Sequence, residues 1–172
     1  MNDLTSNRLF IQTNVNVFYR RVTKIRHHFA KFEETLAPLY LTPPLMTPIG
    51  DEIEPEIPRF VFNSKQGHSQ INISQISLAI NVSYDEKFNR NYDSCEKYVL
   101  ERLSLIFPIL EKLSEDKICY VGLINRLQYH SKKDDHTEAL KFLTEKFLSK
   151  GNYQANLNDF SLKYTNIVND SN

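Results

Sequence analysis

The stretch RFVFNSKQGHSQINISQISLAINVSY, residues 59–84, has the clearest pattern of consecutive β-strands in the sequence. Its first part has two runs rich in β-forming residues around Lys65–Gly67, and the glycine supplies the positive φ that a short hairpin loop needs. At residues 74–75 the alternation of apolar and polar residues slips by one position, which predicts a bulge or a second tight turn. Either feature gives an antiparallel meander.

The residues before the meander predict a strand that is followed directly by a helix. In residues 9–19 apolar and polar residues alternate, as in a strand with one wet side. The two predicted faces are Leu9, Ile11, Val15, Val17 and Tyr19 against Gln12, Asn14 and Asn16. From Val22 to Leu36 the apolar spacing becomes helical, and Pro38 ends this helix.

After the meander, the pattern predicts a long helix and a buried strand. Asp93 and Glu96 have the spacing of a capping box, an apolar stripe runs on to Leu113, and Pro108 predicts a kink. Residues 118–129 are apolar on both strand faces as far as residue 124. We therefore expect this strand to lie inside the sheet, with cover on both sides.

The remaining residues complete an α+β pattern. Residues 135–151 predict a third helix, and residues 160–168 predict a last strand. The order of elements predicts an α+β fold, with a mostly antiparallel sheet and helices packed mainly on one face. With 172 residues, of which 41% are hydrophobic, the chain fits a single domain over residues 1–172.

Residues 38–58 predict a long Pro-rich loop with an acidic centre. The segment holds six prolines and has no regular apolar period. It is too rich in apolar residues for a linker, so we expect it to pack on its own core or on a partner chain, as in a homodimer. The apolar side chains concerned are Leu39, Tyr40, Leu41, Leu45, Met46 and Ile49.

The sequence offers little material for catalysis. It contains no phosphate-binding glycine motif, no nucleophile elbow and no HExxH, so no catalytic residue and no cofactor is predicted. The stretch HSKKDDH, residues 130–136, and the pair His27 and His28 contain metal-ligating types, but a solvated loop and a helix surface explain them better. We predict no metal site. Cys95 and Cys119 fit buried, reduced thiols.

Neither a signal peptide nor a membrane span is evident, and a cytoplasmic protein without membrane contact is expected.

The first predicted helix carries a basic face opposite its apolar stripe. Its residues are Arg20, Lys24, His27 and Lys31. Such a face could contact the phosphates of a nucleic acid. A solvated face is favoured, because 21 basic and 21 acidic residues leave no net charge, and the acidic loop offers another partner for this face.

The stretch CYVGLINRLQYH, residues 119–130, places two polar residues near the middle of an apolar strand. Burial of a polar group costs free energy unless a partner satisfies it. Asn125 is therefore either a buried amide bonded to neighbouring backbone or, with Arg126, part of a polar patch where the strand leaves the core. Both residues are candidates for a binding site.

Taken in order, the segments RFVFNSKQG, INISQISLAINVSYD, NYDSCEKYVLERLSLIF and VGLINRL resemble a sporadically distributed bacterial family of uncharacterised α+β proteins. The resemblance spans about residues 8–170 and implies a bacterial origin and a strand, hairpin, helix and strand core, without an activity. Family members have an Arg-Tyr pair where this chain has Gly122 and Leu123, and they are longer. The resemblance therefore implies that the chain is either a short relative or lacks a C-terminal half.

The sequence as a whole favours a non-enzymatic protein-interaction module, with self-association as one of its forms. Nucleic-acid binding through the basic face of the first helix is the alternative. An enzyme ranks third, because residues that meet only in space leave no linear motif.

Overall fold

The computed structural model describes residues 8–113 and 118–129. The described strands are β1 (Arg8–Tyr19), β2 (Leu45–Met46), β3 (Phe60–Asn63), β4 (Ser69–Ile73), β5 (Ser77–Ser83) and β6 (Ile118–Tyr129). The helices are the 3-10 helix η2 (Ile25–His28), α1 (Phe29–Leu36) and α2 (Tyr92–Leu113). The predicted third helix, the last strand and the HSKKDDH stretch lie outside the described residues.

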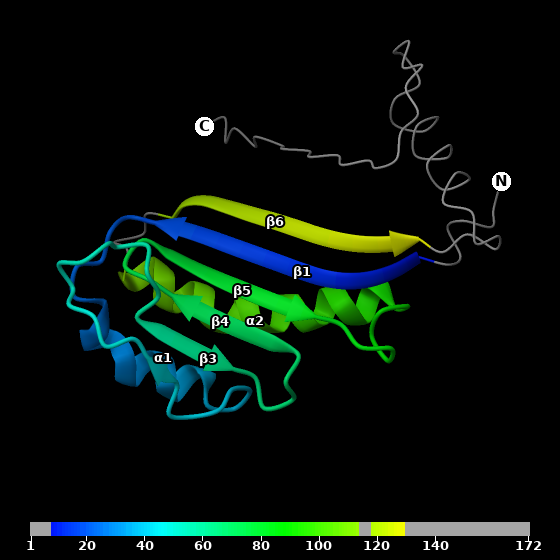
Figure 1. The fold of residues 1–172 in the computed structure, drawn as a ribbon, viewed down its shortest axis with the longest axis horizontal. Helices are drawn as coiled ribbons and strands as arrows, with labels where there is room; N and C mark the ends of the chain where they lie inside the picture. Colours follow the sequence, from blue (N-terminus) through cyan, green and yellow to red (C-terminus); the bar gives the residue numbers. More distant parts are fainter. Residues whose placement is uncertain (1–7, 114–117, 130–172) are drawn as a thin grey trace, which may run out of the picture. The chain divides into compact units, whose positions relative to one another are not determined.

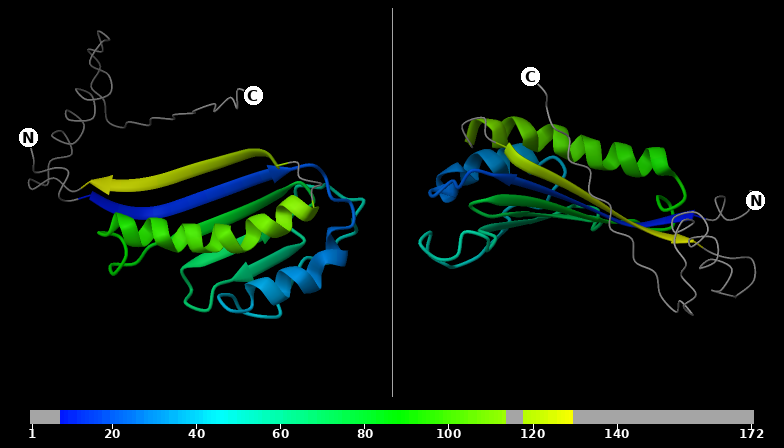
Figure 2. Two further views of the ribbon diagram at one scale, coloured as in Figure 1. Left: turned by 180° about the vertical axis from the view of Figure 1, so that it is seen from behind. Right: turned by 90° about the horizontal axis from the view of Figure 1, so that it is seen from above.

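The predicted fold class is confirmed. The strands form one antiparallel sheet in the order β2-β3-β4-β5-β1-β6 (Figure 1). Both α-helices lie on the same face of this sheet (Figure 2). Residues Arg8–Gln128 make one compact unit, and the prediction of a single domain over residues 1–172 stays a prediction. No helix within the described ranges is long and apolar enough to span a membrane.

The meander forms as the sequence predicts. β3 and β4 pair in antiparallel fashion, and Gly67 in the loop between them has a φ of 76°. The second irregularity is a tight turn: β4 ends at Ile73, and β5 begins at Ser77. The hydroxyl of Ser74 accepts hydrogen bonds from the backbone N–H groups of Ile76 and Ser77, at 3.2 and 2.9 Å, and so holds the turn.

The two faces of the sheet differ in polarity. Toward the helices, cross-strand rows of buried apolar side chains form the core: Phe62, Ile71, Ile80 and Val15 in one row, and Phe60, Ile73, Leu78 and Val17 in the next. On the opposite face a row of amides crosses the same four strands: Asn63, Gln70, Asn81 and Asn14. Asn14 lies on the predicted polar side of β1 but is half-buried, and at the start of the strand Phe10 is buried, whereas Leu9 and Ile11 are half-buried.

The first helix begins later than predicted, at Ile25 instead of Val22. The backbone N–H of Val22 donates to the carbonyl oxygen of Gln75 at 2.8 Å, and the Gln75 side chain donates to the carbonyl oxygen of Thr23 at 2.8 Å. These contacts with the β4–β5 turn hold residues 22–24 in a non-helical conformation, since their backbone groups are already satisfied.

Helix α2 has the predicted extent and includes Pro108, but its cap differs. The side-chain oxygen of Asn91 accepts a 3.1 Å hydrogen bond from the N–H of Ser94, the bond that an N-cap residue makes with the third helical residue. The predicted cap, Asp93, lies inside the first turn instead.

Two arginines, the buried Arg59 and the half-buried Arg26, anchor the loop of residues 38–58. Arg59 is fully buried and donates to the carbonyl oxygens of Ile53 and Ile57, at 2.7 and 2.6 Å. The carboxylate of Asp51 lies 3.3 Å from Nε of Arg26 and 3.7 Å from Nε of Arg59. Neither Nε makes a well-aligned hydrogen bond with it, so this carboxylate acts on both cations through its charge.

The loop packs only partly on the core. Tyr40 is fully buried, whereas Leu41, Leu45 and Met46 are exposed. The prediction that part of the loop lies over the core is therefore confirmed. The expected partner for the exposed part is not tested.

Strand β6 has the predicted bounds but not the predicted position. Among the described strands it pairs only with β1 and forms one edge of the sheet (Figure 1). Val121 and Leu123 are 45% and 61% exposed, so the prediction of an internal, covered strand is wrong. Cys119 in the same strand is exposed, against the predicted buried thiol, whereas Cys95 is buried as predicted. Two apolar faces alone therefore do not establish burial.

Candidate interaction surface

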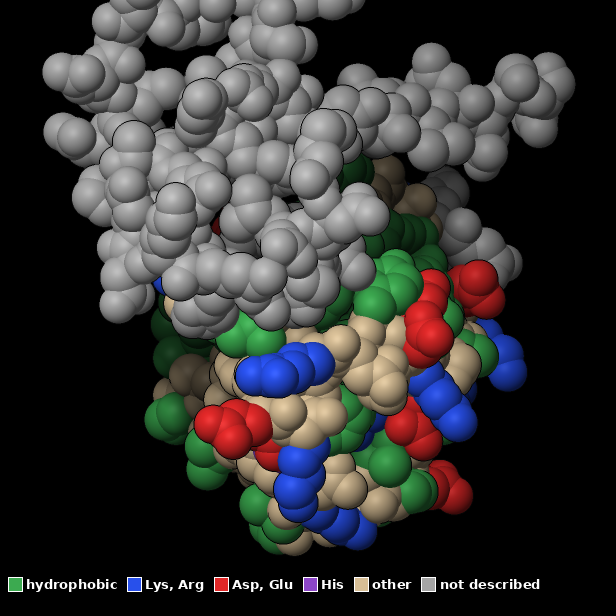
Figure 3. Space-filling view, turned by 90° about the vertical axis from the view of Figure 1, so that its right-hand side faces the viewer, with side chains coloured by type: hydrophobic (Ala, Val, Ile, Leu, Met, Phe, Trp, Pro, Cys, Tyr) green, Lys and Arg blue, Asp and Glu red, His purple; other side chains and the backbone are tan. Residues whose placement is uncertain are grey.

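The four predicted basic residues do not form one helical face. Arg20 and Lys24 precede the first helical residue, His27 lies in η2, and Lys31 lies in α1, although all four are exposed. The acidic loop pairs with Arg26 instead. On the face shown in Figure 3, acidic and basic side chains are interspersed over the coloured surface, without one basic patch. The geometry that the nucleic-acid prediction assumed is absent from this part of the chain.

Asn125 and Arg126 point to opposite faces of the sheet. The Oδ1 atom of Asn125 accepts a 2.7 Å hydrogen bond from Oγ1 of Thr13 in β1, on the face that α2 covers. On the other face the rings of Tyr120 and Phe18 pack with centroids 5.9 Å apart. Both contacts fit one antiparallel register of β6 on β1. Odd-numbered side chains of β6 therefore face α2, and even-numbered ones, including Arg126, face away.

Of the two alternatives for Asn125, the buried amide bonded to neighbouring backbone is wrong. The residue is exposed, and its partner is a side chain. The position of β6 at an edge of the sheet explains both differences. The exposed part of the Asn125 amide can bond to water, so only its inward-facing oxygen needs a protein partner.

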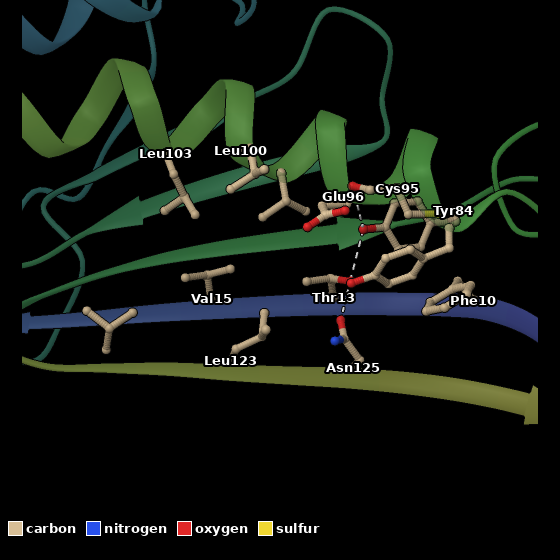
Figure 4. Close-up of a pocket in the computed structure, with 13 residues that line it drawn as sticks. Phe10, Thr13, Val15, Tyr84, Cys95, Glu96, Leu100, Leu103, Leu123 and Asn125 are labelled. Carbon is tan, nitrogen blue, oxygen red and sulfur yellow. Dashed lines mark hydrogen bonds between the residues drawn. The ribbon is translucent and has the colours of Figure 1, made fainter. Parts of the chain in front are cut away.

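A groove lies between α2 and the strands β1 and β6 (Figure 4). We call it the α2–β6 groove, and its volume is about 230 Å³. The described residues that line it are Phe10, Thr13, Val15, Tyr84, Tyr92, Cys95, Glu96, Val99, Leu100, Leu103, Val121, Leu123 and Asn125. Most are apolar or aromatic, and only Glu96 among them is an acidic or basic residue. The groove therefore favours an apolar ligand with few charges.

A short chain of hydrogen bonds crosses the groove. The hydroxyl of Tyr84 donates to Oγ1 of Thr13 at 2.9 Å, and Thr13 in turn donates to Oδ1 of Asn125 (Figure 4). Burial raises the pKa of Tyr84, so this residue remains a protonated donor at neutral pH. Asn125 accepts the last of these hydrogen bonds through Oδ1, and its Nδ2 group donates to no described residue. This Nδ2 group could therefore donate a hydrogen bond to a ligand in the groove.

The described lining of the groove is suited to binding. The Sγ atom of Cys95 donates to the carbonyl oxygen of Phe88 at 3.3 Å, and burial raises the pKa of this thiol to about 11. At neutral pH Cys95 is therefore protonated and is a weak nucleophile. Within the described residues, no group of three or more His, Cys, Asp or Glu is placed to hold a metal ion.

On the opposite side of β6, Tyr120 and Ile124 are 52% and 58% exposed. Gly122 gives room to the tyrosine ring, because a Cβ atom at this position would lie 3.1 Å from a ring carbon of Tyr120. The strand thus presents apolar side chains on both of its sides.

The polar residues of the groove were not singled out from the sequence. A signal was present for Thr13, which occupies the apolar phase of β1 together with Val15 and Val17. Comparisons with protein-family models, curated proteins and solved structures find no match to this chain. The resemblance to a bacterial family stays a prediction, and the candidate site stands on the geometry of β6 and the groove.

Proposed function

We propose that this protein is a non-enzymatic interaction module and that β6 and the α2–β6 groove are its binding surface. One observation carries the proposal: an edge strand of twelve residues exposes large apolar side chains on both of its sides. Exposed apolar surface of this kind commonly marks a contact with another chain. The cytoplasmic location and bacterial origin predicted from the sequence are part of the proposal.

The surface fits an extended segment of a partner chain. No other described strand pairs with the outer edge of β6, whose backbone N–H and C=O groups suit an added strand. On the α2 side, Leu123 and the exposed Leu100 provide apolar contacts, and Asn125 provides a donor. A partner strand with apolar residues at every second position would match this arrangement.

A selection of random twelve-residue peptides on the purified protein tests the proposal. We expect enrichment of peptides with alternating apolar residues, which bind the wild type and lose at least tenfold in affinity for Leu123→Asp. The matched control is Leu45→Asp, because Leu45 lies in β2, at the other edge, and is 65% exposed. A selection without enrichment on a monomeric wild type, or peptides that bind Leu123→Asp as well as the wild type, would count against this function.

A further inference from the structure

From the composition of β6 we infer that its partner is a second copy of this chain, whose β6 pairs with it in antiparallel fashion to form one continuous sheet. The inference rests on the proposed function, because it names the occupant of the same surface. A two-fold axis perpendicular to the sheet relates such strands, so each copy uses the same residues. It also leaves the helices of both copies on one face of the joined sheet.

Within its own sequence, β6 lacks two residue types that commonly prevent strand pairing, proline and a row of charges. It contains no proline, and its one charged residue is Arg126. Residues directly opposite in an antiparallel pair point to the same face. Odd-numbered residues of β6 must therefore pair with odd-numbered ones, and even-numbered with even-numbered ones. In a symmetric pairing this requires that one central residue lies opposite the same residue of the second copy.

Pairing centred on Leu123 uses eleven residues of each strand and produces complementary contacts. Arg126 then lies opposite the exposed ring of Tyr120 of the partner subunit, an arrangement that suits a cation and an aromatic ring. Ile124 lies opposite Gly122 of the partner subunit. The two Arg126 side chains are six residues apart along the joined strands, or about 20 Å, which exceeds the screening length of roughly 8 Å at physiological salt.

The α2 side adds a second layer to this contact. Leu100 is exposed and lines the same groove as Val121 and Leu123. Around the two-fold axis these side chains and their copies meet below the joined strands. Eleven residues span about 37 Å, and a strand with its helix layer is about 20 Å high. The contact is therefore roughly 700 Å² per copy, close to the ~800 Å² of a standard stable interface.

Light scattering over a wide concentration range tests the inference. We expect a dimer mass for the wild type and for Leu45→Asp, and a monomer mass for Leu123→Asp. Thermal unfolding of each variant confirms that it is folded, which is expected because both leucines are exposed.

A cysteine at the centre of the strand sharpens the result. With Cys119→Ser as the background, Leu123→Cys should form an intersubunit disulfide, since opposite Cα atoms lie about 5 Å apart, and Leu45→Cys should not. A wild-type monomer, a Leu123→Asp variant that stays dimeric, or failure of Leu123→Cys to cross-link would overturn the inference. If the wild type is monomeric but selected peptides still depend on Leu123, only the second copy is refuted. If no peptide is enriched either, the proposed function fails as well.

Discussion

The two edges of the sheet are built in opposite ways. At one edge, β2 is only two residues long, and prolines at positions 43, 44 and 48 flank it. Proline has no backbone N–H to offer to another strand, so this edge is poorly suited to pairing. At the other edge, β6 has twelve residues without proline.

Exposed apolar side chains alone do not make an edge suited to strand pairing. Leu45 in β2 is as exposed as Leu123 in β6, at 65% and 61%. What differs is the backbone: the Pro-rich loop limits β2 to two paired residues, whereas β6 presents a long, regular row of donors and acceptors. We call the β2 edge, next to the Pro-rich loop, the blocked edge, and the β6 edge the open edge. A sheet with one edge of each kind would form closed dimers instead of filaments.

The largest expected effect concerns the blocked edge. Arg59→Leu removes the cation whose guanidinium satisfies the carbonyl oxygens of Ile53 and Ile57, and it leaves Asp51 with one cation fewer. Loss of one partner from a buried, bonded group is strongly destabilising, so we expect a loss of about 3 kcal/mol in the free energy of unfolding, measured with urea.

The matched control for this change lies between the two edges. Arg90→Leu replaces an exposed arginine between β5 and α2 and should alter the free energy of unfolding by less than about 0.5 kcal/mol. If both variants unfold at similar urea concentrations, the loop does not depend on Arg59, and the difference between the two edges is smaller than the structure indicates.

A smaller effect is expected where β6 joins the sheet. Thr13→Val removes the hydroxyl that connects Tyr84 to Asn125, and it should cost about 1 kcal/mol because two polar partners lose a hydrogen bond. In the double variant Thr13→Val with Asn125→Leu, one of the stranded partners is also gone. The double variant should therefore lose less than the sum of the single losses, and simple additivity in urea unfolding would show that the two residues are not coupled.

Local patterns predicted the strands of the meander and β6 and the extent of α2, because alternation and turn residues are properties of the chain itself. The beginning of the first helix could not be predicted in this way. It depends on Gln75, which is about fifty residues distant and takes the backbone groups near Val22. Arg59 was missed for a similar reason: its carbonyl partners become close only when the loop folds around it.

The position of β6 was the main error about the candidate site. Apolar residues on both faces are typical of an internal strand and also of an edge strand that binds another chain. The sequence alone does not distinguish these two positions. Among the predicted site residues, Asn125 does line the α2–β6 groove. The predicted basic face assumed a helix that includes Arg20 and Lys24, but the chain is not helical before Ile25.

The smallest expected effect is the response of the blocked side to acid. His28 ends η2, next to α1, which packs on β3 through the rings of Phe29 and Phe60. Burial lowers the pKa of His28, and the charges of His27 and Lys31 lower it further. The unfolded chain therefore binds this proton more tightly than the folded chain does, so stability rises with pH in this window. The stability is fully present above the ordinary pKa of about 6.5 and is lost as the pH falls through that value toward the lower folded pKa.

His28→Gln removes this titration. Between about pH 7.5 and pH 5 the wild type should lose slightly more stability than the variant, and the difference is small because the ring is partly solvated. Urea unfolding at both pH values measures it, and equal losses would contradict the lowered pKa. Because His28 lies on the side of the sheet away from β6, the dimer mass of the variant should vary with pH as that of the wild type does. A dimer that responds to acid only when His28 is present would instead connect the two edges, and the open edge would then not act independently of the blocked one.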